Sequence, residues 1–298
     1  MTECFDRSLA GIQVSAKITE KLFMRINTNM GAIQSQRALT TVNRETEESF
    51  GKLASGERIT KAADDAAGLA ISEKMKANIR SSKMASRNAN DGISMVQVAE
   101  GGLNESTSVL TRMRELAMQA ASDSVSDTER AMTQMEFQGM KMELERIAQG
   151  TVFNGKKLLN GSGSQMDFQV GVAGAGVNDQ ISYDAGGFNA SIAALGVGSV
   201  EVLSKQGAQQ SLGVIDQAFN KISTQRSSLG SIQNRLLSSS NNLGYYTENM
   251  SVSNSRIRDL DYASEASKQA RNTTVQSAAT AVASQANTTP QAALRLFS

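Results

Sequence analysis

The feature that most constrains this chain is an apolar stripe through its C-terminal quarter. Steps of three and four residues link a first set of positions, Leu212, Ile215, Phe219, Ile222, Arg226 and Leu229. After one missing step of four near Leu229, the same spacing resumes through Leu236 and Leu243 and ends at Leu260. This spacing places all of these residues on one face of a helix. Such a helix would be roughly 70 Å long and needs other helices beside it.

Three further segments supply those helices. The strongest has the spacing Leu103, Ser106, Leu110, Met113, Ala117 and Ala120; the others have Phe137, Met140, Leu144 and Ile147, and Ile71, Met75 and Ile79. The polar segment Ser122–Glu129 predicts a loop followed by a helix start, with acids in the first turn. A single proline and an aromatic content of 4% suit long thin helices better than a thick globule. We therefore predict a bundle of three helices from the N-terminal half and one from the C-terminal half.

The pattern changes between Asn154 and about Lys205. Apolar residues alternate with polar ones at Met166, Phe168 and Val170, and glycines supply turns. We expect a small β-rich insert with a solvated acidic surface. The predicted fold class is mainly α, with long coiled-coil-like helices from both chain ends, a helical bundle and this insert.

Both chain ends also have helical spacing, but their apolar residues are smaller. Ile26, Met30 and Ile33 begin an N-terminal stripe, and a C-terminal stripe of Val275, Ala279, Val282 and Ala286 is expected to end at Pro290. Burial of apolar surface contributes roughly 25 cal/mol per Å², so an alanine seam cannot offset the ordering entropy of two isolated helices. These ends should be disordered in the free monomer and should fold when neighbouring copies add more surface.

Composition argues against several function classes. The chain has no histidine, so it has no imidazole base and no ordinary histidine-ligated metal site. A net charge of +1 gives no electrostatic reason to expect nucleic acid or an anionic membrane as a partner. The segment Met1–Phe23 is too charged for a cleavable secretion signal. We predict no catalytic activity, no cofactor and no metal.

Two residue sets need interpretation. Asp64 and Asp65 are adjacent acids, but neighbours point to different sides of a helix, so capping and polar contact between copies are favoured over catalysis or metal binding. Methionines recur through the bundle segments and are interpreted as helix-packing filler. This second set is Met75, Met95, Met113, Met118, Met132, Met135, Met140 and Met142.

Several motifs resemble those of the bacterial flagellins. Met24-Arg-Ile-Asn-Thr-Asn is similar to the family's N-terminus, and Leu53-Ala-Ser-Gly-Glu-Arg-Ile followed by Lys61-Ala-Ala-Asp-Asp-Ala-Ala-Gly-Leu-Ala is similar to its most recognisable block. Three more occur in family order: Arg112-Met-Arg-Glu-Leu-Ala-Met-Gln, Phe153-Asn-Gly and Ser284-Gln-Ala-Asn-Thr-Thr-Pro. The resemblance covers about Met24 to Pro290.

The resemblance implies a secreted, extracellular filament subunit for swimming motility. Its expected partners are other copies of itself, the flagellar (type III) export apparatus, the filament cap, hook-associated proteins, and an export chaperone on Ser264–Leu296. Residues 24–61 and 257–298 would form the inner coiled-coil domain, and residues 62–256 the helical bundle domain, with the β-rich insert at about 154–205. The terminal residues expected to carry assembly are Ile26, Met30, Ile33, Val275, Val282 and Leu294.

The resemblance also implies a second contact surface. Arg112, Leu116 and Glu136 match in type and spacing the residues with which the family contacts the vertebrate Toll-like flagellin receptor. From the residues alone, the alternative is ordinary surface charge beside one apolar residue.

One departure from the family pattern concerns the start of the chain. Residues 1–23 precede the family-like N-terminus at Met24, and we expect a misassigned start over a genuine extension. Filament-derived protein should then have a mass that corresponds to a start near Met24 and should lack Cys4.

Other functions are kept as alternatives. A hook-filament junction protein shares the terminal coiled-coil design, and a cytoplasmic coiled-coil adaptor would require folded termini in the monomer. An enzyme hidden in the centre is disfavoured by its size and by the missing histidines.

Overall fold

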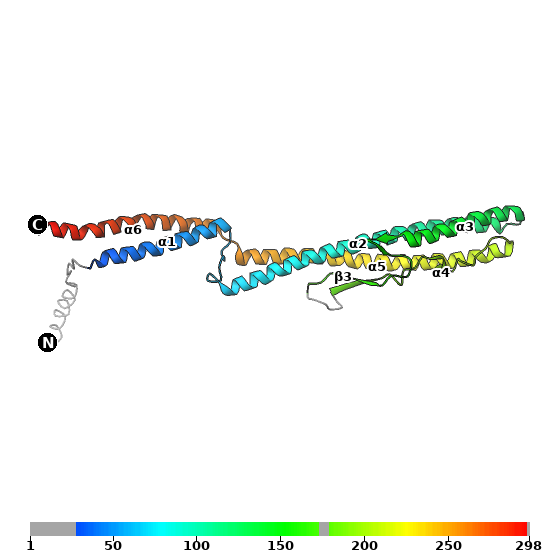
Figure 1. The fold of residues 1–298 in the computed structure, drawn as a ribbon, viewed down its shortest axis with the longest axis horizontal. Helices are drawn as coiled ribbons and strands as arrows, with labels where there is room; N and C mark the ends of the chain where they lie inside the picture. The colour runs from blue at the N-terminus through cyan, green and yellow to red at the C-terminus, as the bar shows by residue number, and fades with distance from the viewer. Residues whose placement is uncertain (1–27, 173–178, 297–298) are drawn as a thin grey trace, which may run out of the picture. The chain divides into compact units, whose positions relative to one another are not determined.

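The computed structural model describes residues 28–172 and 179–296, with side chains up to Thr288. The chain divides into two compact units, one comprising residues up to Ala66 together with those from Arg258 onward, and the other Ala67–Ile257. The helices of the described residues, shown in Figure 1, are α1 Met30–Ser55, α2 Ala66–Ala120, α3 Asp127–Gly150, α4 Ile192–Leu195, α5 Lys205–Arg258 and α6 Tyr262–Leu296. The predicted mainly α fold is confirmed.

Helix α2 replaces two of the predicted helices with one. Its 55 residues contain both the stripe at Ile71 and the stripe at Leu103. Small buried residues continue the spacing of three and four between them, because Ser82, Ala85, Ala89 and Gly92 all face inward. The bundle therefore takes two long helices from the N-terminal half, and the prediction of three was wrong.

Helix α5 follows a slightly different stripe from the predicted one. The least exposed line runs through Ile215, Ala218, Ile222, Gln225 and Leu229 without a missing step, with Gln225 half-buried and the others buried. The bulkier Phe219 and Leu212 lie at its border, partly buried against the core. The apparent gap near Leu229 arose because small and polar residues occupy seam positions.

The helix that contains this stripe stops at Arg258, before the predicted end at Leu260. Asp261 starts the next helix, since its Oδ1 accepts the N–H of Ala263 at 3.1 Å and that of Ser264 at 3.4 Å.

Helix α3 begins as predicted. Ser126 is its N-cap, and Glu129 returns a carboxylate to the Ser126 N–H at 2.8 Å, which completes a capping box. These Ser126 hydrogen bonds hold the pKa of the Glu129 carboxyl below its ordinary value.

The β-rich insert contains two antiparallel pairs of strands. Strand β1 (Val152–Phe153) pairs with β2 (Lys156–Lys157), and β3 (Gln165–Gln169) pairs with β4 (Gln180–Asp184) with Asp167 opposite Ser182. Tyr183 of β4 is buried, stacks on Phe188 with ring centroids 4.9 Å apart, and donates its hydroxyl to the Leu158 carbonyl at 3.0 Å. Both rings of this aromatic pair belong to the buried apolar cluster that the insert shares with the bundle helices.

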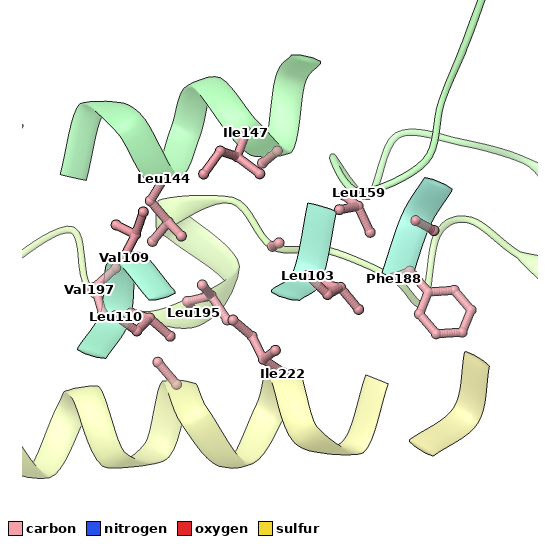
Figure 2. Packing of buried hydrophobic residues seen from close by; sticks show 14 of the residues in the cluster. Leu103, Val109, Leu110, Leu144, Ile147, Leu159, Phe188, Leu195, Val197 and Ile222 are labelled. Atoms are coloured by element: carbon pink, nitrogen blue, oxygen red, sulfur yellow. The ribbon is translucent and has the colours of Figure 1, made fainter. Parts of the chain in front are cut away.

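One hydrophobic core joins the bundle helices and the insert. Figure 2 shows Leu110 of α2, Leu144 of α3 and Ile222 of α5 pointing toward Leu195 of α4. All members of this cluster lie between Ala89 and Leu236, so it belongs to the second unit. In the described part of the chain, no helix is both long and apolar enough to cross a membrane.

Candidate assembly surfaces

Helices α1 and α6 pack against each other as an antiparallel pair (Figure 1). The least exposed positions of α1 repeat every three and four residues through Ala32, Ser35, Leu39, Val42, Thr46, Ser49 and Leu53. Those of α6 are Glu265, Gln269, Asn272, Gln276, Ala279, Ala283 and Ala286. This α1–α6 seam is heptad-spaced, but α6 contributes only alanines and polar residues to it.

Side-chain hydrogen bonds connect the two helices along their length. The Ser49 hydroxyl donates to Glu265 Oε1 at 2.6 Å, and Gln276 Nε2 donates to Asn43 Oδ1 at 2.8 Å. The Tyr262 hydroxyl donates to the Leu53 carbonyl. Because polar pairs in a helical seam penalise misaligned registers, these bonds specify how the two ends align.

The Asn29 side chain connects the start of α1 to the C-terminal part of α6 through both its oxygen and its nitrogen. Its Oδ1 caps α1 by accepting the Ala32 N–H at 3.1 Å, and its Nδ2 donates to the Ala286 carbonyl at 2.7 Å. Proline has no N–H, so Pro290 cannot supply the usual helical donor to Ala286. The Asn29 amide supplies the missing donor to the Ala286 carbonyl. Helix α6 therefore continues to Leu296, and the predicted end at Pro290 was wrong.

The segments that leave α1 and enter α6 also pair. The Arg58 N–H donates to the Arg258 carbonyl at 2.7 Å, and the Leu260 N–H donates to the Gly56 carbonyl at 3.0 Å. The Glu57 carboxylate lies 2.9 Å from the Arg258 guanidinium. Gly56 has φ 70°, a left-handed conformation that favours glycine and ends α1.

Asp64 organises the loop before α2. Its Oδ2 accepts the N–H groups of Lys61 at 3.0 Å and Thr60 at 3.1 Å, and Lys52 Nζ lies 3.5 Å from Oδ1. The Lys61 N–H, with help from Thr60 and Lys52, holds the pKa of this carboxyl below its ordinary value. The Asp64 carboxylate thus stabilises the loop upstream of it, while Asp65 directly precedes α2, so capping of that helix stays a prediction for Asp65.

The predicted terminal assembly residues lie outside the α1–α6 seam. Met30 and Ile33 are 54% and 40% exposed, and Val275 and Val282 are 44% and 58% exposed. The predicted stripes grouped these residues with seam positions such as Ala279. In the structure, these four bulky side chains lie on the faces of α1 and α6 that point away from the seam. Ile26 lies outside the described residues, as does the side chain of Leu294.

The predicted receptor set is only partly brought together. Arg112 donates to Glu136 Oε1 from Nη2 at 2.6 Å and from Nε at 3.0 Å, and pairs with Glu115 at 3.0 Å. Glu136, followed by Glu115, raises the pKa of the Arg112 guanidinium. Leu116 is 2% exposed and belongs to the core, so the expected apolar surface residue is absent from this ion-pair surface.

Other polar residues with structural roles escaped sequence reasoning. Lys141 is 5% exposed and donates to the carbonyls of Gly198 at 3.0 Å and Val200 at 2.5 Å. Gln134 accepts the Val202 N–H at 2.7 Å. Their spacing of seven on α3 is visible in the sequence, but no local pattern distinguishes these buried polar residues from exposed ones.

The methionines divide by exposure into three groups, of which Met75 and Met140 form the partly buried one. Met95 and Met113 are buried, as expected for packing filler. The filler interpretation was wrong for four others, which are more than half exposed: Met118, Met132, Met135 and Met142. In the residues described, no cluster of three or more metal-ligating side chains occurs.

Long helices form this fold, and its two chain ends pair as α1 and α6 through a seam that contains many polar side chains. These features define a class of structural proteins built from long helices. Two family models match this chain: the bacterial flagellin N-terminal helical region over residues 26–164, and the bacterial flagellin C-terminal helical region over residues 212–297. The chain belongs to the bacterial flagellin family.

Individual relatives agree along most of the chain. A flagellin of Bacillus subtilis is 40% identical, and a flagellar filament core protein of Brachyspira hyodysenteriae is 38% identical. Each match covers 92% of this chain and all of the relative. Among solved structures, a flagellin of Bacillus cereus is 27% identical over 53% of this chain and 88% of its own, with a TM-score of 0.47.

Proposed function

We propose that this chain is a structural subunit that polymerises into the bacterial flagellar filament and serves swimming motility outside the cell. The observation that carries the proposal is the surface of the α1–α6 pair, which the two chain ends form. Helix α6 contributes only alanines and polar residues to the seam, while Met30, Ile33, Val275 and Val282 remain exposed. Each copy therefore offers apolar surface that only neighbouring copies can bury, as a repeating, non-closing assembly requires.

The proposed domain assignment separates the chain ends, which carry assembly, from the bundle. Residues 24–61 and 257–298 form the inner, filament-building domain, and residues 62–256 form the outer bundle domain with its insert. A junction protein between hook and filament would share the paired ends. Relatives named as flagellins and filament core proteins favour the filament subunit.

Export partners complete the proposed life cycle. The subunit leaves the cell unfolded through the flagellar export apparatus, joins the filament under its cap, and contacts hook-associated proteins at the base. The C-terminal segment Ser264–Leu296 is the proposed site of an export chaperone. Its polar seam supports this role, because a helix that contributes only alanine and polar side chains to a pair buries little apolar surface there and separates readily.

Negative-stain electron microscopy tests the central proposal. Purified subunit is mixed with short filament seeds and a salting-out salt, beside a version truncated after Asp259. We expect long tubes from the intact chain and none from the truncated one. Small closed oligomers from the intact chain would instead favour a junction protein or an adaptor.

A vertebrate Toll-like flagellin receptor is a second proposed partner. The exposed ion pair of Arg112 and Glu136 supports it, while the buried position of Leu116 restricts the contact to the charged residues. Depolymerised protein should activate receptor reporter cells, and Arg112→Ala should weaken the signal. A silent wild-type protein would refute this partner.

A further inference from the structure

Helix α3 is apolar on two opposite faces. Its inner face carries Phe137 and Leu144, both fully buried in the core. Its outer face carries Met132, Met135 and Met142, which are 66%, 77% and 69% exposed. At about 100° per residue these methionines and Gly139 lie within an arc of about 80°. We call the three methionines the α3 methionine stripe.

An exposed row of large apolar side chains marks an interaction surface, so we expect the α3 methionine stripe to be covered in the working state. Gly139 lies in the middle of the stripe with open space where a side chain would stand, so another surface can approach closely. The occupant that fits is a second copy of this chain, since the family's members are filament subunits.

The charges beside the stripe do not oppose such an approach. Glu136 is paired with Arg112 at 2.6 Å, and Glu143 is paired with Arg146 at 2.5 Å. Because each carboxylate already has a partner within the chain, covering the stripe with a second copy strands no unpaired charge.

The chemistry of the stripe points to a modification. A thioether is the side-chain group most readily converted by peroxide into a polar sulfoxide, and exposure favours its reaction. The sulfur lone pair attacks the peroxide O–O bond; an S–O bond forms, the O–O bond breaks and water leaves. The sulfur loses two electrons and the peroxide gains them.

We propose that Met132, Met135 and Met142 are sites of oxidation by hydrogen peroxide, and that their sulfoxides prevent the subunit from joining a growing filament. The inference rests on the proposed polymerisation. A sulfoxide is a strong hydrogen-bond acceptor that keeps its water, so an oxidised stripe resists burial against another copy. Met95 and Met113 are 3% and 0% exposed and should stay reduced under the same treatment.

The test uses the full chain and seeded elongation. Monomer is treated with hydrogen peroxide, the peroxide is removed, and each methionine is measured by peptide mass spectrometry. We expect the stripe to oxidise before Met95 and Met113, and elongation to fall by at least about tenfold, or about 1.4 kcal/mol. Both proteins carry Met30→Leu, because Met30 is 54% exposed and belongs to the proposed assembly surface. The control adds the triple variant Met132→Leu, Met135→Leu, Met142→Leu, which keeps an apolar stripe without sulfur and should elongate equally before and after treatment.

Several results would overturn the inference. The inference fails if the peroxide-treated protein elongates normally with its stripe oxidised, or if the triple variant loses elongation as strongly as the protein that keeps the stripe. Untreated wild type that fails to elongate would refute the proposed function and the inference together. If the triple variant cannot assemble, peroxide footprinting of wild type decides: the stripe must be protected in filaments relative to monomers, and equal oxidation in both would refute the inference.

Discussion

Lys141 occupies a buried position that an apolar residue could not fill equally well. Its ammonium lies 5.6 Å from the centre of the Phe137 ring and bonds two backbone carbonyls of the segment after α4. Burial lowers the pKa of this amine, and attraction to Glu201 only partly opposes the shift. A neutral amine still has two N–H donors, so deprotonation removes the cost of burying charge without abandoning either carbonyl.

The pH dependence of stability follows from that shift. The unfolded chain binds the Lys141 proton more tightly than the folded chain does, so wild type should gain stability as pH rises from neutral toward 10.5, the ordinary value. Lys141→Met lacks this gain and leaves two carbonyls without donors, costing about 1–3 kcal/mol at neutral pH. Urea unfolding of both proteins across this pH range measures the difference, which should widen. A constant or shrinking difference would contradict the assignment.

The core of the second unit should respond strongly to truncation. Leu110 is fully buried, so Leu110→Ala should destabilise that unit by about 3 kcal/mol through lost burial and a residual cavity. Leu237 on α5 is 51% exposed, and Leu237→Ala is the matched control, expected to change stability by less than about 0.5 kcal/mol. Equal shifts of the urea midpoint in the two variants, relative to wild type, would show that Leu110 is not a core residue.

At the scale of elements, the sequence predicted helices better than it predicted their seams. The stripe through Leu103 and Leu110, the helix start within Ser122–Glu129 and the alternation in β3 each have a local signal, and each is confirmed. Seam positions held by Ala218 or Gln225 have no such signal, because a search for bulky apolar residues passes over them. Packing against the facing helix decides those positions.

The terminal pair is the clearest case of this limit. Bulky residues such as Met30 and Val282 marked a plausible stripe, yet the pair closes on Thr46, Ser49 and Asn272. A close helix pair can be built from small and polar side chains when hydrogen bonds cross it. Their partners lie more than two hundred residues away in the sequence, and no local pattern reports them.

Asn272 offers a direct test of the polar seam. It is 7% exposed, and its Nδ2 has no hydrogen-bond partner within the described part of the chain. Replacing it with leucine removes a buried polar group and adds apolar contact, so Asn272→Leu should stabilise the α1–α6 pair by about 1–3 kcal/mol. Proteolysis of α6 in the free subunit should slow accordingly. The control is Thr273→Leu on the exposed face, and equal slowing in both variants would contradict the seam assignment.

At the scale of the whole molecule, the two units differ in what holds them together. Ala67–Ile257 contains an extended apolar core of helices and insert, whereas the α1–α6 seam is small and polar. The sequence prediction that the ends are disordered in the free monomer concerns an equilibrium and stays a prediction. This account predicts a folded subunit whose bundle is stable before and after assembly and whose ends pair stably only beside neighbours.

Hydrogen–deuterium exchange, compared between free subunit and seeded filament, tests this account most directly. Amides of α1 and α6 should exchange rapidly in the free subunit and become protected in the filament. Amides of α2 and α5 between Leu103 and Leu236 should be protected in both states and serve as the internal control. Equal protection of α6 in the free subunit and the filament would contradict the account and favour a folded adaptor.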